Sequence, residues 1–452
     1  MAASSGLTPQ SIEDVDVTWQ FENLDTALAA MLGIAFDKDN QKDHKGHEMQ
    51  QAYDAIIVGA RCAGSPTAMQ LARKGYRVLV VDRATFPSDT VSTHVMQPPA
   101  VAALARWGLL DRLTATGCPP IHTYTFDFGP ITISGTPGTQ DTPVAYCPRR
   151  TVLDKLLVDA AAEAGAVLRE EIAVTDLLRD GDRVVGIKGR SKDGATVTER
   201  AQVVIGADGR YSLVAEAVRP QQYNEKPPLL AAYYTYWSDL PMDGRFETYI
   251  RPHRGFAAAP THDGWTLTVG GWPHAEFEAN KKDVGGNFLK MFDLAPEFAE
   301  RVRGAKREAP FAGAAVSNFF RKPYGAGWAL VGDAGGSYEF STAHGITNAF
   351  READWLAEAL NAGGASPLDG SPESLSAFHA RRDAAELPSA RFTISQATFQ
   401  PVPDPAGAGA LFSAISRDVQ ATSDFLGVFA QTHSASAFFA PENIGAIMQR
   451  AS

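Results

Sequence analysis

Cysteine is scarce in this sequence, and clusters of basic residues are missing. The three cysteines among 452 residues, Cys62, Cys118 and Cys147, form no Cys-x-x-Cys pair. This usage argues against a disulfide-stabilised secreted domain, a disulfide reductase and a zinc site, and we expect no metal. Acidic residues outnumber basic ones, and the formal net charge is −11. Without a block of Lys and Arg, the chain lacks the surface charge that nucleic acids and anionic membranes require.

Two further absences concern location. No apolar run approaches the roughly 20 residues that span a bilayer. The first residues also lack the basic start and apolar core of a secretory signal. We therefore expect a cytoplasmic protein without a membrane span. The length allows two or three globular domains of about 150 residues each.

Residues 1–51 differ from the rest of the chain. Apolar side chains recur at helical spacing over 21–36, and a polar stretch follows. We expect a short helix on an arm that packs on the body of the protein or on a second copy, so a homodimer is an arrangement to test.

From Tyr53 onward the pattern predicts a β-α-β unit. An apolar strand over 53–58 leads into a glycine-containing turn, a helix over 65–74 and a second strand over 77–81. About thirty residues is the length of a parallel strand pair joined by one helix. Further elements are predicted as helices at 99–107, 152–164 and 346–360, strands within 229–272 and at 328–331, and helices from 374 onward.

The turn at 59–65, of sequence GARCAGS, is typical of a dinucleotide-binding loop. Gly59 and Gly64 occupy the places of the glycines that make the tight turn and the close helix–strand contact. Arg61 stands where bare backbone is usual, and its guanidinium could add a charge-assisted contact to a pyrophosphate. The following helix N-terminus offers free N–H groups to phosphates.

Asp82 ends the second strand, 23 residues after Gly59. An acidic side chain at this place accepts hydrogen bonds from ribose hydroxyls. Arg83 follows it, and we include both residues among those expected to bind the cofactor.

Three later segments carry related patterns. Asp208 and Gly209 follow an apolar strand, and Gly332-Asp333 follow another. Arg150 stands in an Arg-x-x-Leu-Asp setting. In this order the motifs resemble those of the glutathione-reductase-type FAD fold, in the p-hydroxybenzoate hydroxylase-like branch of class A flavoprotein monooxygenases. Geranylgeranyl reductases and flavin halogenases are more distant members.

The resemblance covers about residues 53–380 and implies an α/β protein. Its FAD-binding Rossmann-like fold would carry an inserted strand-rich substrate domain and a helical C-terminal region. The expected division is a helical arm and linker at 1–51, the first part of the FAD-binding domain at 52–225, the substrate domain at 226–310, the second part of the FAD-binding domain at 311–373, and the C-terminal helical region at 374–452.

The resemblance also implies roles for residues. Asp333 would bind the FAD ribitol, Asp208 would close around the cofactor, and Arg150 would lie near it. The helix that starts at Gly345, Ile346 and Thr347 would point its positive end at the flavin. Two residues depart from the hydroxylase pattern, because Phe340 replaces a proline beside the flavin ring and Thr347 replaces an asparagine.

Two histidines are candidates for chemistry. The family passes the segment around His94 close to the flavin, where an imidazole could bind FAD, steer the nicotinamide, or serve as an acid or base. His344 lies just before Gly345. A buried structural role is the alternative for both. Seven aromatic residues in the strand-rich stretch would mostly fill its core, with one or two lining a substrate pocket: Tyr233, Tyr234, Tyr236, Trp237, Phe256, Trp265 and Trp272.

The resemblance thus predicts a monooxygenase that uses FAD, NAD(P)H and O2 to hydroxylate an electron-rich aromatic or similar small molecule through a flavin C4a-hydroperoxide. No second dinucleotide loop is found, so the nicotinamide would visit the flavin transiently. The first alternative is a flavin reductase of isoprenoid double bonds, which Phe340 and the apolar C-terminal helices favour. A flavin halogenase is less favoured, because its Trp-x-Trp-x-Ile-Pro motif is missing. A non-catalytic FAD-binding module is the last alternative.

Overall fold

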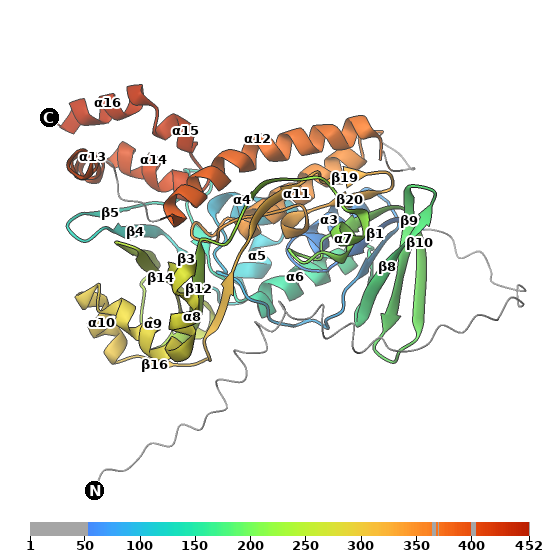
Figure 1. The fold of residues 1–452 in the computed structure, drawn as a ribbon, viewed down its shortest axis with the longest axis horizontal. Coiled ribbons are helices and arrows are strands. Elements are labelled where there is room, and N and C mark those ends of the chain that lie inside the picture. The colour runs from blue at the N-terminus through green and yellow to red at the C-terminus, as the bar shows by residue number, and fades with distance from the viewer. Residues whose placement is uncertain (1–52, 364–367, 369, 399–403, 452) are drawn as a thin grey trace, which may run out of the picture.

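The computed structural model describes residues 53–363, 368, 370–398 and 404–451 (Figure 1). The predicted arm at 1–51 lies outside these residues. The described chain folds into two eight-stranded sheets, one three-stranded sheet and one two-stranded sheet, with helices packed on them, and the predicted β-α-β unit lies in the eight-stranded sheet that is mainly parallel.

A mainly parallel sheet forms the nucleotide-binding half. Its path is β19 (Tyr324–Gly325), β20 (Trp328–Leu330), β10 (Thr196–Gly206), β1 (Tyr53–Val58), β2 (Val78–Val81) and β7 (Val167–Arg169), with only β19 antiparallel to its neighbour. The inner strands read as continuous apolar runs because both of their faces are buried. On β1, Ala55 and Ile57 face one layer, while Ile56 and Val58 face the other.

Helices cover one face of this sheet, and a small antiparallel sheet covers the other. The helical layer contains α3 (Gly64–Arg73), α4 (Pro98–Trp107), α6 (Arg150–Glu163) and α11 (Gly345–Leu360). The other layer contains β8 (Ile172–Asp180), β9 (Arg183–Ser191), the start of β10 and α7 (Leu213–Val218). The predicted fold class is confirmed, with element boundaries shifted by one or two residues.

The strand-rich half is a second large sheet. Its order is β16 (Lys306–Arg307), β12 (Leu230–Ser238), β15 (Thr266–Pro273), β14 (Arg254–Pro260), β13 (Arg245–Arg251), β4 (Thr123–Asp127) and β5 (Thr132–Gly135), and β17 (Ala312–Ala315) also pairs with β12. The strands β4 and β5 come from the segment 52–225. The sheet therefore draws on residues outside 226–310, because β13 pairs in parallel with β4.

Helices lie on both faces of the second sheet. The helices α9 (Val284–Phe292) and α10 (Pro296–Arg303) bury an aromatic cluster against one face. The C-terminal helices α13 (Pro405–Arg417), α14 (Val419–Phe429), α15 (Ala435–Phe438) and α16 (Pro441–Ala451) pack on the other. The predicted helical C-terminal region is present in the described part of the chain.

Short elements connect the two halves. The strands β11 (Gln222–Lys226), β18 (Asn318–Arg321) and β21 (Gly336–Ser337) form a third sheet, and β3 (Pro120–Ile121) pairs with β6 (Ala145–Tyr146). The helices α5 (Leu110–Thr114) and α8 (Phe277–Asn280) are short. The long helix α12 (Pro372–Ala397) runs beside α11 toward the C-terminal helices (Figure 1). Among the described residues, no helix is long and apolar enough to cross a membrane.

Candidate functional site

Three motifs that are far apart in the sequence meet at one edge of the parallel sheet. The amide of Gly59 donates to Val81 O at 2.8 Å, that of Ala207 to Val58 O at 2.8 Å, and that of Val331 to Gly206 O at 3.0 Å. These bonds place the ends of β1, β10 and β20 side by side. The carboxyl edge of such a sheet is where α/β proteins bind nucleotides.

Glycine is required at each of these turns. Gly59 has a φ of +101°, and a Cβ there would lie 2.4 Å from Ala207 O. A Cβ on Gly64 would lie 1.8 Å from Gly59 O, which confirms the close helix–strand contact. Gly332 has a φ of +65°, and its Cβ would come within 2.8 Å of Ala63 Cβ. The glycine loop and the Gly-Asp motif are therefore in direct contact.

Two helix N-termini border this edge. Neither α3 nor α11 has an acidic residue in its first turn, so their amides are not neutralised locally. Gly345, at the start of α11, is exposed, and a Cβ there would meet no atom within 4 Å. Ile346 and Thr347 are buried behind it, with Thr347 Oγ1 accepting from Gln97 N at 3.3 Å. The positive end of α11 thus faces open space, as an anion-accepting site requires.

Asp333 is exposed, yet the surrounding protein raises the pKa of its carboxyl by desolvation. The positive charges of Arg210 and Arg150 act in the opposite direction. The residue is accessible at the cofactor edge, where an acidic hydrogen-bond acceptor suits the hydroxyls of a sugar alcohol, the role expected from the resemblance.

The acidic residue at the end of β2 holds the loop itself. One carboxylate oxygen of Asp82 accepts from Ala60 N at 2.7 Å, and the other accepts from Ala84 N at 2.8 Å. Each oxygen retains a second lone pair, so the predicted ribose contact is still chemically open. Arg83 beside it is exposed.

Arg61 turns toward α6 instead of lying free over the loop. Its Nη1 donates to Asp154 Oδ2 at 2.6 Å and its Nη2 donates to Ser88 Oγ at 2.8 Å. Asp154 is fully buried and also receives two nitrogens of Arg150 at 2.9–3.0 Å. One carboxylate therefore joins two of the three arginines predicted to bind the cofactor, Arg61 and Arg150. The pyrophosphate contact predicted for Arg61 would compete with this ion pair.

Asp208 organises the turn that follows β10. Its side chain accepts from Ser212 Oγ at 2.5 Å and from Val214 N at 3.2 Å at the start of α7. Burial raises the pKa of this carboxyl, while the hydrogen bonds oppose the rise. Its neighbour Arg210 donates to Ala315 O at 3.1 Å, and the positive charge of Arg210 acts to lower the pKa of Asp333.

His94 is completely buried against the second sheet. Its Nδ1 lies 2.6 Å from Ser92 O, so this nitrogen carries the proton, and Nε2 accepts from Tyr236 Oη at 2.6 Å. Burial, reinforced by the charge of Arg150, lowers the pKa of His94 to about 3. The imidazole is therefore neutral and fully hydrogen-bonded. Its geometry favours orienting Tyr236 over accepting a proton at neutral pH.

His344 connects the start of α11 to the C-terminal helices. Its Nε2 donates to Phe429 O at 2.8 Å, and Tyr338 Oη lies 3.4 Å from its Nδ1. Burial lowers the pKa of His344 to about 4. Phe340, four residues earlier, is half-buried, and its carbonyl accepts from Ala343 N at 2.8 Å.

The second sheet divides the predicted aromatic residues between its faces. Tyr233, Trp237, Phe256 and Trp272 fill the cluster under α9 and α10. Tyr234 and Tyr236 lie on the opposite face, in the cluster that contains Ala343 from the loop before α11. Trp265 packs at the edge of that cluster, 6.0 Å from Tyr236 between ring centres. The face with Tyr234 and Tyr236 is therefore the one turned toward the cofactor edge.

Sequence reasoning missed several residues that build this site. Glu352 accepts from Gly332 N at 3.1 Å and is buried within α11, where burial and the nearby carboxyl of Glu386 on α12 raise its pKa. Gln97 donates to Thr342 O at 3.1 Å and accepts from Tyr124 Oη at 2.5 Å. Only the contact of Asp154 could be predicted from local sequence, because Asp154 follows Arg150 by four residues and lies on the same helix face. The others depend on contacts between distant segments.

The residues present fit FAD. Three glycines allow the close approach of the turns, two helix N-termini without acidic residues border this sheet edge, and the exposed Asp333 supplies an acidic acceptor there. This donor and acceptor set matches a phosphate-linked nucleotide with a polyhydroxyl chain.

Comparisons with known proteins agree. Residues 52–265 match the model of an FAD binding domain. The chain is 27% identical to digeranylgeranylglycerophospholipid reductase 2 of Methanococcoides burtonii over 327 residues, covering 67% of this chain and 73% of that protein. Its fold is similar to that of the flavin-dependent brominase Bmp2 (TM-score 0.70, 18% identity, 88% of this chain and 99% of that one). The p-nitrophenol 4-monooxygenase PnpA of Pseudomonas putida has a TM-score of 0.68 at 18% identity, over 85% of this chain and 99% of that one. The chain therefore carries an FAD binding domain over residues 52–265 and shares its fold with a flavin-dependent brominase and a monooxygenase.

Proposed function

We propose that this enzyme is a FAD-dependent monooxygenase that uses NAD(P)H and O2 to hydroxylate an electron-rich aromatic or similar small molecule. The observation that carries the proposal is the pair His94–Tyr236, which with Tyr234 lines the sheet face turned toward Ala343 and α11. A hydroxyl held by a buried neutral imidazole, between aromatic rings, is suited to orienting a phenol or aniline.

When bound, FAD would accept hydride from NAD(P)H and activate O2. The chain's own residues would bind and enclose it. Asp333 would hold the ribitol, and the first turn of α11 would stabilise negative charge with its dipole. Tyr236 donates a hydrogen bond to His94 and would keep its acceptor lone pairs for a substrate hydroxyl. The buried aromatic cluster around Tyr236 would exclude water from the reacting atoms.

The test begins without oxygen. Protein loaded with FAD is mixed with NADH and then NADPH, and the visible flavin band is followed with and without a panel of phenols and anilines. We expect one aromatic compound to accelerate bleaching. The reaction is then run under ¹⁸O₂, and the product should carry one labelled oxygen. A flavin that neither nicotinamide reduces, or a product labelled only from water, would contradict the proposal.

A reductase of isoprenoid double bonds is the second candidate. The similarity to digeranylgeranylglycerophospholipid reductase 2 favours it, as does the apolar cluster that α13–α16 add to the same sheet face. Phe425, Phe429 and Phe438 belong to that cluster. A reaction without O2 distinguishes the two candidates, because a reductase reoxidises its reduced flavin by saturating a double bond under anaerobic conditions, whereas a monooxygenase requires O2.

A further inference from the structure

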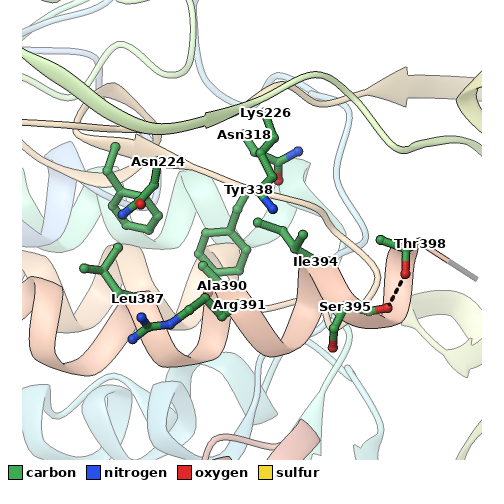
Figure 2. Close-up of a pocket in the computed structure, with 11 residues that line it drawn as sticks. Asn224, Lys226, Asn318, Tyr338, Leu387, Ala390, Arg391, Ile394, Ser395 and Thr398 are labelled. Carbon is green, nitrogen blue, oxygen red and sulfur yellow. Dashed lines mark hydrogen bonds between the residues drawn. The ribbon is translucent and has the colours of Figure 1, made fainter. Parts of the chain in front are cut away.

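A pocket of about 300 Å³ lies outside the cofactor edge, between the third sheet and α12. Figure 2 shows its walls, with Lys226 and Asn318 on the strand side, Ala390 and Ile394 on α12, and Tyr338 between them. The volume is at the lower end of that of sites for small organic ligands. Its lining residues are separate from those proposed to bind FAD and the aromatic substrate.

The pocket combines an apolar wall with positive charge. Phe320, Leu387 and Ile394 contribute apolar surface, and Lys226 and Arg391 are its two charged residues. Both cations are exposed, and neither has an ion-pair partner within the described part of the chain. Carboxylates partner most other buried or half-buried arginines nearby, as Asp383 does for Arg382 at 2.8 Å. A ligand for this pocket should therefore bring a negative charge and an apolar body.

The back wall connects the pocket to the start of α11. Tyr338 lines the pocket, and its hydroxyl accepts from Asn348 Nδ2 at 2.8 Å and lies 3.4 Å from His344 Nδ1. Asn348 and His344 flank the first turn of the helix whose positive end faces the cofactor edge. A shift of the Tyr338 ring would therefore change the hydrogen bonds that hold this turn.

We propose that the pocket binds a small organic anion, with a carboxylate or phosphate on an apolar body, and that Tyr338 transmits its occupancy to the flavin end of α11. The anionic group is recognised by Lys226 and Arg391, and the apolar body lies against Phe320, Leu387 and Ile394. Ligand binding would therefore change the surroundings of the flavin through Tyr338 and α11, without direct contact between ligand and flavin. This inference needs only FAD binding and holds whichever oxidative or reductive reaction the enzyme performs.

The probes are octanoate, octyl phosphate and octanol, each titrated into the FAD-loaded protein below its micelle concentration. Binding is measured by calorimetry and the flavin by its visible spectrum. We expect both anions to bind and to perturb the spectrum, and octanol to bind at least several-fold more weakly. Comparison of octanoate with octyl phosphate decides between the two head groups. Equal binding of octanol, or no binding of either anion, overturns the proposal.

Variants test the assignment. Lys226→Gln and Arg391→Gln should each weaken anion binding about threefold to fivefold, as loss of a part-exposed ion pair would. Arg381→Gln, on the same helix but paired with Glu358, and Lys322→Gln, stacked on Tyr324, are matched controls that should leave binding unchanged. Tyr338→Phe should retain anion binding but lose the spectral change. If both pocket variants bind the anions as tightly as the wild type, the ligand binds elsewhere. If the flavin spectrum of Tyr338→Phe still changes on anion binding, Tyr338 does not transmit occupancy of the pocket to the flavin.

Discussion

Tyr236 and His94 share a hydrogen bond of 2.6 Å that joins the second sheet to the segment between β2 and α4. The Nδ1–H of His94 donates to Ser92 O, so at the other ring nitrogen the tyrosine hydroxyl is the donor and Nε2 the acceptor. The pair therefore fixes the tautomer of the histidine and the direction of the tyrosine hydroxyl together.

Tyr236→Phe should lower the free energy of unfolding by about 1–2 kcal/mol, because it leaves His94 Nε2 buried without a donor. Tyr233→Phe is the matched control on the same strand. The hydroxyl of Tyr233 is buried without a hydrogen-bond partner among the described residues, so its removal should be neutral or slightly stabilising. Chemical denaturation of both variants checks the contrast. Equal losses would mean that the His94 contact contributes nothing.

The stability of the protein should fall as pH drops through the range of an ordinary histidine. Burial lowers the pKa of His94 to about 3 and that of His344 to about 4 in the folded chain. Below about pH 6.5 the unfolded chain therefore binds protons that the folded chain does not, and each histidine costs up to about 1.4 kcal/mol per pH unit. The raised pKa values of the buried Glu352 and Glu386 act in the opposite direction, so the histidine contribution is the difference in the slope of the unfolding free energy between wild type and a histidine variant from pH 7.5 to 5.5.

His94→Gln should be less stable at pH 7.5 but should lose less stability on acidification. His253→Gln, at an exposed turn, should keep the wild-type slope. A wild-type slope in His94→Gln would mean that this histidine titrates normally.

Two carboxylates on α6 should differ sharply in their effect on stability. Asp154→Asn removes the charge that faces Arg61 and Arg150 in the interior, and should cost about 3 kcal/mol or more. Asp159→Asn breaks a half-exposed pair with Lys155 at the same spacing, and should cost less than about 0.5 kcal/mol. Urea unfolding of both variants measures the difference. Similar small losses would show that Asp154 is more hydrated than its burial implies.

Loss of the Asp333 carboxylate should weaken the binding of FAD. Asp333→Asn removes a charged acceptor at the cofactor edge whose hydrogen bonds are worth about 1.5–3 kcal/mol, so the affinity for FAD should fall about tenfold to a hundredfold. Titration of flavin-free protein by flavin fluorescence gives the affinity, and circular dichroism shows whether the fold is kept. Glu358→Gln, on the exposed side of α11, is the control. Unchanged affinity in Asp333→Asn would rule out its assigned contact with the ribitol.

The nucleotide-binding half could be predicted from local features of the sequence. Continuous apolar strands, the glycines at 59, 64 and 332, and the acidic residue after β2 are local features, since the backbone at those turns accepts only glycine and a doubly buried strand accepts only apolar residues. Their order along the chain sufficed to predict the fold and FAD.

The contacts of the other side chains depend on how the helices and sheets pack together. Alternation predicts that the aromatic residues of β12 fall on two faces, but only packing shows that Tyr236 faces His94 while Tyr233 faces α9 and α10. Arg61 has a charge suited to a phosphate, yet Asp154, 93 residues later, holds it. Glu352 and Glu386 approach each other from two helices and bear no motif. Such contacts join segments far apart in the chain, and no local pattern encodes them because each depends on how whole elements pack.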